Sequence, residues 1–388
     1  MSRSNAIFLF VVAMLASPAF SADPPAGTTL PDDIDPATGL ARTTVVRPYG
    51  DAPPPPAALP LEKPVAVRPH VALILPTASP ALGGLAGAVR AGFVAAVEAA
   101  GRESVPVGVT AVADEGQGLV EACRQAQRAG AFLVVGGFTR DGAQTLATSD
   151  CARQPVLALN ELRGPDLPQS AYSFSLSLDN EARQVANVAV GDGWRSAIVI
   201  GSNTPLSRRV QEAFEREWTR SAGEFRRIAF NGNPEDAPMV RERIARLGAG
   251  DMVFLALGPD EARAVRPYIS GMLPIYGTTL SVNPRADPIV NVDLQGVRYV
   301  EMPWFVHPDH PAVMSYPPPK GVMSVEHERL YAFGIDAFRV ALVLARGNPA
   351  KAVIDGVTGR IVLEDRHFAR SLSPAEVDGG RVIPLRPQ

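Results

Sequence analysis

Apolar runs alternate with helical segments along most of this chain, and one stretch shows the pattern clearly. It contains the run FLVVGG (132–137), the turn FTRDG, a short helical segment and the run PVLALN (155–160). Two apolar runs that flank one helix are typical of a parallel βαβ unit. The turn at 138–141 is then expected at the carboxyl edge of the sheet, where the N–H groups of a helix N-terminus meet a ligand or a partner. Function in such folds gathers at this edge.

The same alternation predicts two consecutive α/β lobes. In the first lobe it predicts strands at 71–75, 105–112 and 132–137 and helices at 85–100 and 118–129. In the second it predicts helices at 179–190, from 207, at 236–247 and at 259–269, and strands at 197–200, 225–230, 252–257 and 275–278. Strands and helices joined by short loops indicate parallel sheets flanked by helices. The predicted fold class is therefore α/β.

A long apolar helix at 326–345 and a C-terminal tail follow the second lobe. A helix of this length needs a large surface to cover, and we expect the first lobe to provide it. The tail has strand-like segments at 356–363 and 381–385. We place the first lobe at about 70–175 and 303–347, and the second at about 176–302 and 348–388. The chain then crosses between the lobes more than once, and such crossings act as hinges.

Residues 1–21 have the features of a secretory signal peptide. Arg3 supplies the positive charge, residues 6–16 form an apolar core too short to span a bilayer, and Pro18 precedes the cleavage zone. Cleavage after Ser21 leaves no Cys at the new N-terminus. We expect a periplasmic protein without a lipid anchor, and association with the outer membrane stays open.

Residues 22–69 form a Pro-rich tract that includes four consecutive prolines at 53–56. This composition favours extended polyproline II segments and buries too little apolar surface to fold. We expect a disordered linker, and the alternative is a recognition segment for the groove of a partner.

Composition and motifs argue against several functions. The net charge is −3, and no basic stripe is present, so nucleic acid is not an expected partner. The sequence contains no G-x-S-x-G, no phosphate loop ending in Gly-Lys-Ser/Thr, no H-E-x-x-H and no S-x-x-K. We therefore predict a protein that is not an enzyme and needs no cofactor.

The two cysteines and a His-rich loop are the other candidates for chemistry. Cys123 and Cys151 in an exported chain fit a disulfide, but two buried free thiols fit the sequence equally well. His307 and His310 have a spacing that binds one metal ion on a helix. Since prolines flank His310 and no third ligand is evident, we favour an exposed loop and predict no metal site.

Six segments of the folded part form an ordered set: PHVALILPTASPALGGLAGAVRAGF, PVLALN, DGWRSAIVIGSNTPLSRRVQEAFEREW, DLQGVRYVEMPW, ERLYAFGIDAFRVALVL and GVTGRIVLED. In this order and spacing they resemble the C-terminal domain of the LppC/LpoA family of penicillin-binding protein activators. The resemblance covers essentially all of residues 70–375. It implies a two-lobe type 1 periplasmic-binding-protein fold, with hinge crossings between the lobes.

That fold implies a cleft between the lobes, lined by turns at the carboxyl ends of the strands. The candidates are Thr77, Ser79, Phe138, Thr139, Asn160, Asn203, Thr204 and Thr278, with the neighbours Glu161 and Thr279. In amino-acid binders with this fold, hydroxyl and N–H groups at the third strand–helix turn hold the ligand carboxylate, and Thr139 is the matching position. Ser, Thr and Asn at such turns are also ordinary N-caps, and we favour this role for each taken singly.

Phe138 is a bulky residue for a turn that would hold a small polar ligand. Its ring fits two arrangements, stacking on a ring-bearing ligand or filling a closed cleft. The combined interpretation is a non-catalytic envelope protein that regulates peptidoglycan synthesis by protein contact, with a bifunctional penicillin-binding protein as partner. The alternative is a periplasmic receptor of an ABC transporter for an amino acid or a similar small polar ligand.

Overall fold

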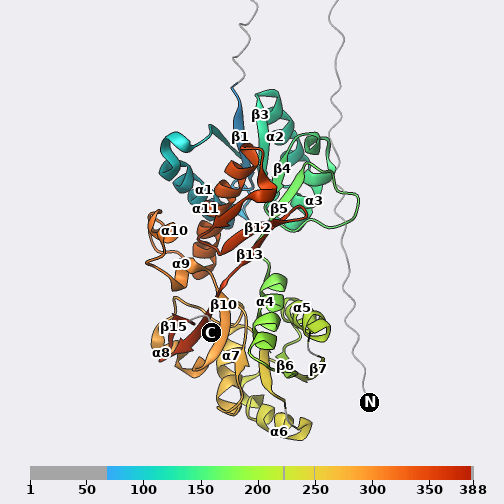
Figure 1. Ribbon diagram of the computed structural model, residues 1–388, viewed down its shortest axis with the longest axis vertical. Coiled ribbons are helices and arrows are strands. Elements are labelled where there is room, and N and C mark those ends of the chain that lie inside the picture. Colours follow the sequence, from blue (N-terminus) through green and yellow to red (C-terminus); the bar gives the residue numbers. More distant parts are fainter. Residues whose placement is uncertain (1–67, 222, 249, 386–388) are drawn as a thin grey trace, which may run out of the picture. The chain divides into compact units, whose positions relative to one another are not determined.

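The computed structural model describes residues 68–385, apart from residues 222 and 249 (Figure 1). The predicted signal peptide, and the predicted linker up to residue 67, lie outside the described residues. Two mainly parallel sheets organise the described part, and each sheet with its helices forms one lobe. The α/β fold class predicted from the alternating pattern is confirmed.

Eight strands form the sheet of the first lobe. They are β1 (His70–Leu75), β2 (Val107–Ala111), β3 (Ala131–Gly136), β4 (Val156–Ala158), β5 (Ala171–Phe174), β11 (Val353–Asp355), β12 (Arg360–Glu364) and β13 (His367–Ser371). Their order is β11-β12-β13-β5-β4-β3-β1-β2. The pairs from β5 to β2 are parallel, and so is the pair of β13 with β5, whereas β11, β12 and β13 pair antiparallel.

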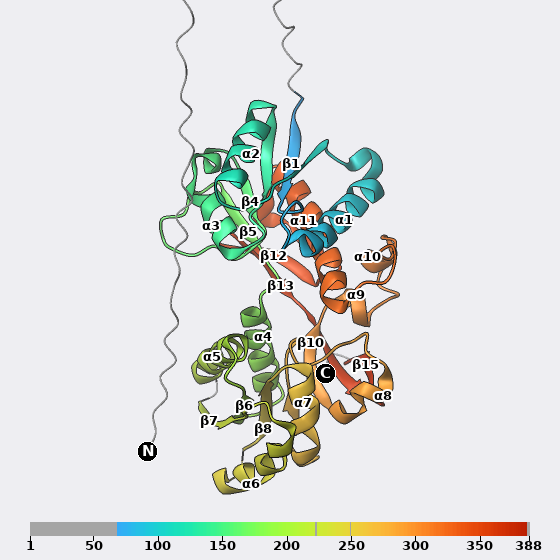
Figure 2. The ribbon, with the colours of Figure 1, turned by 180° about the vertical axis from the view of Figure 1, so that it is seen from behind.

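Helices cover both faces of this sheet. They are α1 (Gly83–Ala100), α2 (Gln117–Arg128), α3 (Arg140–Thr148) and α11 (Val325–Ala345). Alternate residues of β1 enter different cores: Leu73 packs in the core that contains α1 and α11, and Ile74 packs in the core of α2 and α3. Figures 1 and 2 show these two helix pairs on opposite sides of the sheet. The predicted covering of the first lobe by the long apolar helix is confirmed.

Two glycines let α1 and α11 approach closely. A Cβ on Gly92 of α1 would overlap the backbone oxygen of Tyr331, and a Cβ on Gly334 of α11 would overlap the backbone oxygen of Val89. The backbones of α1 and α11 can therefore touch at this crossing only because glycine has no side chain. Among the described residues, Gly83–Glu103 is the helical stretch with the length and composition of a membrane span, a property that core helices share.

The second lobe is built on a seven-stranded sheet. Its strands are β6 (Ser196–Gly201), β7 (Glu224–Ala229), β8 (Met252–Ala256), β9 (Ile275–Tyr276), β10 (Val297–Glu301), β14 (Ser373–Asp378) and β15 (Arg381–Pro384), in the order β15-β14-β10-β9-β8-β6-β7. Its helices are α4 (Leu178–Gly191), α5 (Pro205–Ser221), α6 (Pro238–Leu247), α7 (Pro259–Val265) and α8 (Pro288–Asn291). The short helices α9 (Pro303–Val306) and α10 (Pro311–Met314) precede α11. The strands from β10 to β7 pair in parallel, and β14 and β15 extend the edge antiparallel.

One part of the predicted lobe boundary is wrong. We expected residues 348–388 in the second lobe, but β11, β12 and β13 extend the first sheet, and within the described residues β14 and β15 join the second. The reason is the parallel pairing of Phe368 with Phe174, which buries Phe368 in the core of the first lobe. The chain therefore crosses between the lobes after β5, after β10 and after β13.

Candidate functional site

Three of the cleft candidates meet at the start of α3. Thr139 is the N-cap, and its hydroxyl accepts a hydrogen bond from the N–H of Gly142 at 3.0 Å. The amide of Asn160 donates to the carbonyl oxygen of Phe138 at 2.8 Å and accepts from the N–H of Glu161 at 2.9 Å. The ring of Phe138 is half-buried against the core. The capping role that we favour for Thr139 is confirmed, and Phe138 fills space beside the turn.

A carboxylate of the chain itself binds the N–H groups of this turn. Glu115, in the loop after β2, accepts hydrogen bonds from the N–H of Phe138 and from the N–H of Thr139, both at 2.6 Å. Gly142 makes room for it, because a Cβ at this position would lie 2.6 Å from Oε2 of Glu115. The carboxylate of Glu115 therefore occupies the position that the resemblance assigns to a ligand carboxylate.

Four further candidates lie in local turns. Thr77 and Ser79 are half-buried after β1, and neither side chain makes a hydrogen bond to another described residue. Thr204 accepts from the N–H of Ser207 at 3.2 Å, which is the bond of an N-cap. Thr278 is fully buried, and its hydroxyl accepts from the N–H two residues later at 3.3 Å. None of these geometries calls for a ligand.

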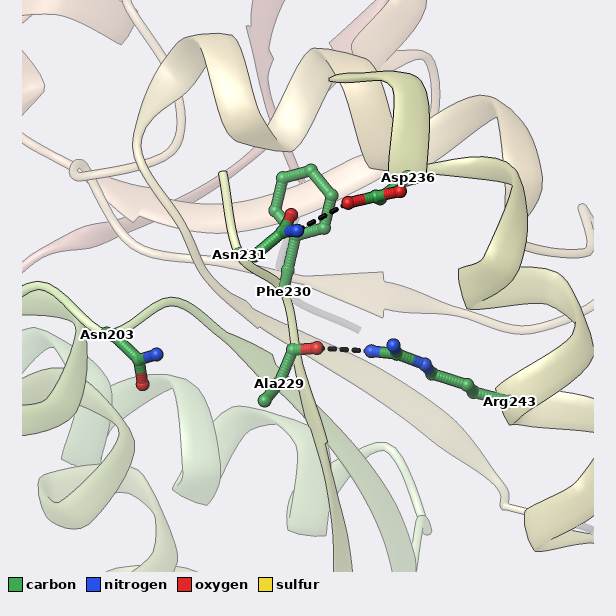
Figure 3. Close-up of a pocket in the computed structure, with 6 residues that line it drawn as sticks. All are labelled: Asn203, Ala229, Phe230, Asn231, Asp236 and Arg243. Carbon is green, nitrogen blue, oxygen red and sulfur yellow. Dashed lines mark hydrogen bonds between the residues drawn. The ribbon is translucent and has the colours of Figure 1, made fainter. Parts of the chain in front are cut away.

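Asn203 lines a small polar pocket of the second lobe (Figure 3). The pocket has a volume of about 230 Å³ and is lined by Asn203, Ala229, Phe230, Asn231, Asp236 and Arg243. Inside it, Asn231 donates to Asp236, and Arg243 donates to the carbonyl oxygen of Ala229. Two of its polar side chains thus bind each other and a third binds the backbone. Thr139 is not among the residues that line this pocket.

A larger pocket, of about 470 Å³, lies between the two lobes. The second lobe contributes the turns after β8 and β9 and the first turn of α4, and the first lobe contributes the start of α11. Most of the wall is apolar: Leu176, Leu178, Leu206, Pro259, Leu280, Val282, Met302, Val325 and Leu330. Thr279 is the one cleft candidate that lines it. Apolar walls with a few polar groups are typical of small-molecule pockets of this size.

Glu181 is the buried charge of this inter-lobe pocket. It lies in the first turn of α4 and is 3% exposed. Its Oε2 accepts hydrogen bonds from the hydroxyl of Thr279 at 2.6 Å and from the N–H of Thr279 at 3.2 Å. Its Oε1 has no hydrogen-bond partner among the described residues. Burial raises the pKa of Glu181, and the positive charge of Arg370 acts in the opposite direction.

Two ion pairs join the lobes beside the inter-lobe pocket. Arg329 of α11 donates to Glu301, the last residue of β10, at 2.8 Å. Arg285, in the loop after β9, donates from Nε to Glu328 of α11 at 2.9 Å. Both guanidinium groups also lie over the ring of Phe305, at 5.0 Å for Arg285 and 5.5 Å for Arg329. The positive charge of Arg329, which lines the pocket, is thus already paired.

A comparison of the whole sequence with family models identifies its relatives. The model described as "LppC putative lipoprotein" matches residues 65–377, which is more than half of the chain. The chain belongs to the LppC family. The family resemblance of the ordered segments is thereby confirmed.

Curated relatives of this LppC-family chain carry the name penicillin-binding protein activator LpoA. The relative from Edwardsiella piscicida is 26% identical in an alignment 305 positions long, which covers 68% of this chain and 44% of that protein. The relative from Escherichia coli (strain K12) is 24% identical in an alignment 319 positions long, which covers 69% of this chain and 46% of that protein. The chain therefore spans less than half the length of these relatives.

Solved structures share the two-lobe fold. Full-length LpoA from Haemophilus influenzae aligns with a TM-score of 0.67 at 22% identity, over 81% of this chain and 58% of that chain. A protein from Chromobacterium violaceum, described as a "putative branched-chain amino acid ABC transporter", aligns with a TM-score of 0.69 at 34% identity, over 80% of this chain and all of that chain. The predicted type 1 binding-protein architecture is confirmed.

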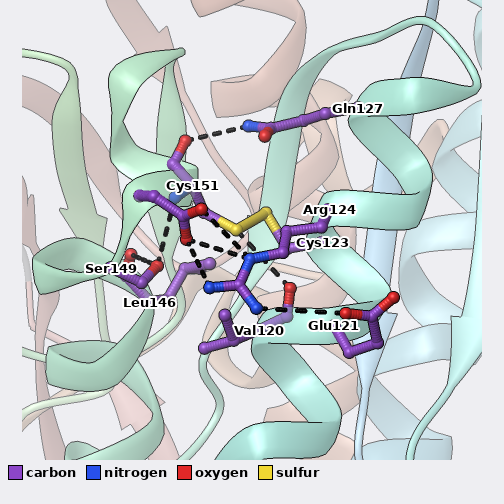
Figure 4. Close-up of a disulfide and its surroundings, with 9 residues drawn as sticks. Val120, Glu121, Cys123, Arg124, Gln127, Leu146, Ser149 and Cys151 are labelled. Atoms are coloured by element: carbon purple, nitrogen blue, oxygen red, sulfur yellow. Dashed lines mark hydrogen bonds and ion pairs between the residues drawn. A yellow bond between two sulfur atoms is a disulfide. The ribbon is translucent and has the colours of Figure 1, made fainter.

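Cys123 and Cys151 of the LppC-family chain form a disulfide (Figure 4). It joins α2 to the turn Asp150–Arg153, with the two Cα atoms 6.3 Å apart. Arg124 beside it donates from Nε to both carboxylate oxygens of Asp150, at 3.2 and 3.1 Å. Of the two alternatives that the sequence left open, the structure has the disulfide. Since both cysteines are fully buried, the bridge is a structural one.

The His-rich loop uses one of its imidazoles as a helix cap. Nδ1 of His310 accepts from the N–H of Ala312 at 3.2 Å, and Nε2 lies 3.4 Å from the carboxylate of Asp355. In the described part of the chain, no group of three or more His, Cys, Asp or Glu could hold a metal ion.

Sequence reasoning missed Glu115, Glu181 and Arg329. For Glu181 a signal exists, because it stands next to Ala182 and one turn before Val185 on the buried face of α4. A charge at an inward position of an amphipathic helix indicates a buried polar site. For Glu115 no local signal exists, since its partners lie 23 and 24 residues further along the chain.

Proposed function

We propose that this protein is a non-catalytic accessory protein of the cell envelope that activates a penicillin-binding protein by direct contact, and so regulates peptidoglycan synthesis. The observation that carries the proposal is the LppC family match over residues 65–377, together with curated relatives named penicillin-binding protein activator. A bifunctional synthase is the proposed partner, and the periplasm is the proposed location.

The geometry of the first lobe favours a role in which the protein binds no solute that carries a carboxylate. In a receptor for amino acids, the N–H groups at the start of α3 must be available to the ligand. Here Glu115 accepts from both of them. A solute with a carboxylate would have to displace this side chain. This arrangement favours a protein in which the binding-protein fold is a scaffold for contact with another protein.

A periplasmic solute receptor is the second candidate. It is favoured by the likeness to the protein from Chromobacterium violaceum and by the pocket between the lobes. The two candidates make opposite predictions about amino acids. A receptor is stabilised by its solute, because a ligand that binds only the folded state raises the free energy of unfolding.

The deciding experiment combines binding and enzyme assays. The purified chain is immobilised and exposed to a purified bifunctional penicillin-binding synthase, and the rate of glycan polymerisation is measured with and without the chain. We expect saturable binding and faster polymerisation. A solute receptor of the same fold is the matched control. Absent binding together with an unchanged polymerisation rate would remove the activator proposal, and thermal stabilisation by amino acids would then support the receptor.

A further inference from the structure

The inter-lobe pocket has the features of a built ligand site, and these features define the chemistry of its ligand. Its volume of about 470 Å³ falls in the range of small-molecule pockets. Nine apolar side chains from both lobes form most of its wall. An apolar body of small size therefore fits it, since burying such a body removes apolar surface from water.

The polar end of the pocket is a carboxylate with an unused acceptor. Glu181 is 3% exposed, and both of its hydrogen bonds with Thr279 go to Oε2. Among the described residues Oε1 accepts no hydrogen bond, although Glu181 lines the pocket. Oε1 is not among the fully enclosed polar atoms without a partner, so it retains contact with the open space of the pocket. A ligand in the pocket that donates a hydrogen bond can therefore reach it.

The charges around the pocket favour a cation over an anion. Three charged residues line it: Glu181, Glu326 and Arg329. Arg329 is paired with Glu301 at 2.8 Å, and its guanidinium lies over Phe305. The charge of Arg329 is thus paired, although its Nε has no hydrogen-bond partner among the described residues. Glu181 has no ion pair within 4.0 Å among the described residues, and the buried guanidinium of Arg370, which does not line the pocket, acts on it with the opposite charge. An anionic group in the pocket would face the carboxylate of Glu181.

We propose that the inter-lobe pocket binds a compact apolar molecule that carries an ammonium group, with the ammonium donating to Oε1 of Glu181. The ligand touches α4 and the turn after β9 in one lobe and α11 in the other, so it stabilises the lobes in their present arrangement. The proposal goes beyond the contact with a penicillin-binding protein and does not depend on it.

The test uses probes that share one apolar body and differ in the polar group. Hexylammonium, hexan-1-ol, hexanoate and leucine are titrated into the purified chain, and binding is measured by calorimetry and by thermal shift. We expect hexylammonium to bind more tightly than hexan-1-ol, and hexanoate and leucine to bind more weakly than both. Glu181→Gln should weaken hexylammonium by about thirty-fold or more while leaving hexan-1-ol within about threefold. Glu326→Gln, at the exposed rim, is the matched control and should change little.

A second variant keeps the proposal testable if Glu181→Gln does not fold. Leu206 lines the pocket and is 38% exposed, so Leu206→Arg adds a positive charge there with little risk to the core. It should weaken hexylammonium and spare hexan-1-ol. Tighter binding of hexanoate or leucine, or no saturable binding of any probe, would overturn the proposal. These outcomes leave the synthase assay unaffected, so failure of one proposal is distinguishable from failure of the other.

Discussion

Replacing Glu115 by Ala tests whether this side chain takes the place of a ligand carboxylate. The variant loses two charge-assisted hydrogen bonds of 2.6 Å, to the N–H groups of Phe138 and Thr139. A hydrogen bond to a charged group contributes about 1.5–3 kcal/mol when it is buried. Because Glu115 is partly exposed, water can replace part of this interaction. We therefore expect a loss of about 1–3 kcal/mol in the free energy of unfolding, comparable to the loss of a strong N-cap.

The assay is urea unfolding at constant ionic strength, in chloride and in acetate. Acetate fits the space that Glu115→Ala vacates and should bind the two N–H groups. At a concentration ten times its dissociation constant it would restore about 1.4 kcal/mol. Glu115→Gln is the matched control, because the amide keeps one acceptor and still fills the site. Its stability should fall between the other two and should not respond to acetate.

Two results would refute this reasoning. The first is a Glu115→Ala variant as stable as the parent, which would mean that water replaces the carboxylate without cost. The second is an equal effect of acetate on all three proteins, which would show a general salt effect instead of binding at the start of α3.

Three other predictions concern stability. Gly334→Ala should lower the free energy of unfolding by about 1–3 kcal/mol in urea melts, because its Cβ overlaps the backbone of α1. Gly87→Ala is the control: its Cβ meets nothing within 4 Å, so the free energy of unfolding should rise by up to about 1 kcal/mol. Equal losses of stability in both variants would contradict the packing argument. Cys123→Ser should cost about 3–4 kcal/mol, as expected for a closed loop with a sequence separation of 28, and an unchanged urea midpoint would show that the bridge does not restrict the unfolded chain. Burial raises the pKa of Glu181 in the folded state above its usual value of 4.5. Protonation of Glu181 therefore contributes in full to the free energy of unfolding below pH 4.5, and this contribution is lost as the pH rises through the folded-state pKa. The stability of the parent relative to Glu181→Gln should then fall with rising pH, by at most about 1.4 kcal/mol per pH unit, and a difference independent of pH would be inconsistent with a raised pKa.

Much of the fold could be predicted from sequence because buried parallel strands are continuous apolar runs. The runs that contain Leu73 and Val134 are such strands, and each is followed by a helix of the expected period. The tail could not be assigned in this way. Its strands are short and partly exposed, and their sheet is decided by the pairing of His367 with Ser173, almost 200 residues away in the sequence. Local pattern contains no information about such a partner.

The sequence pattern predicted where the candidate site lies, but not which side chain occupies it. The start of α3 is the edge turn that the pattern indicates, and Thr139 caps it as expected. The side chain that occupies the turn comes from another loop, and only the fold brings Glu115 there. The residues of the inter-lobe pocket were missed for a related reason. They lie on helices and turns whose apolar side chains are typical of core packing, and a pocket wall has the same composition as a core.

Glu115 and Glu181 together change the electrostatics that a binding protein of this fold offers to a solute. In the first lobe a carboxylate of the chain binds the N–H groups at the start of α3, and in the second a buried carboxylate faces the pocket. The positive charge that could attract an anion, on Arg329, is paired across the lobes with Glu301. Both halves of the cleft therefore disfavour an anionic solute. The ion pairs of α11 with the second lobe join the two lobes in the structure. This agrees with the proposed contact with a partner and leaves the inter-lobe pocket for the proposed cation.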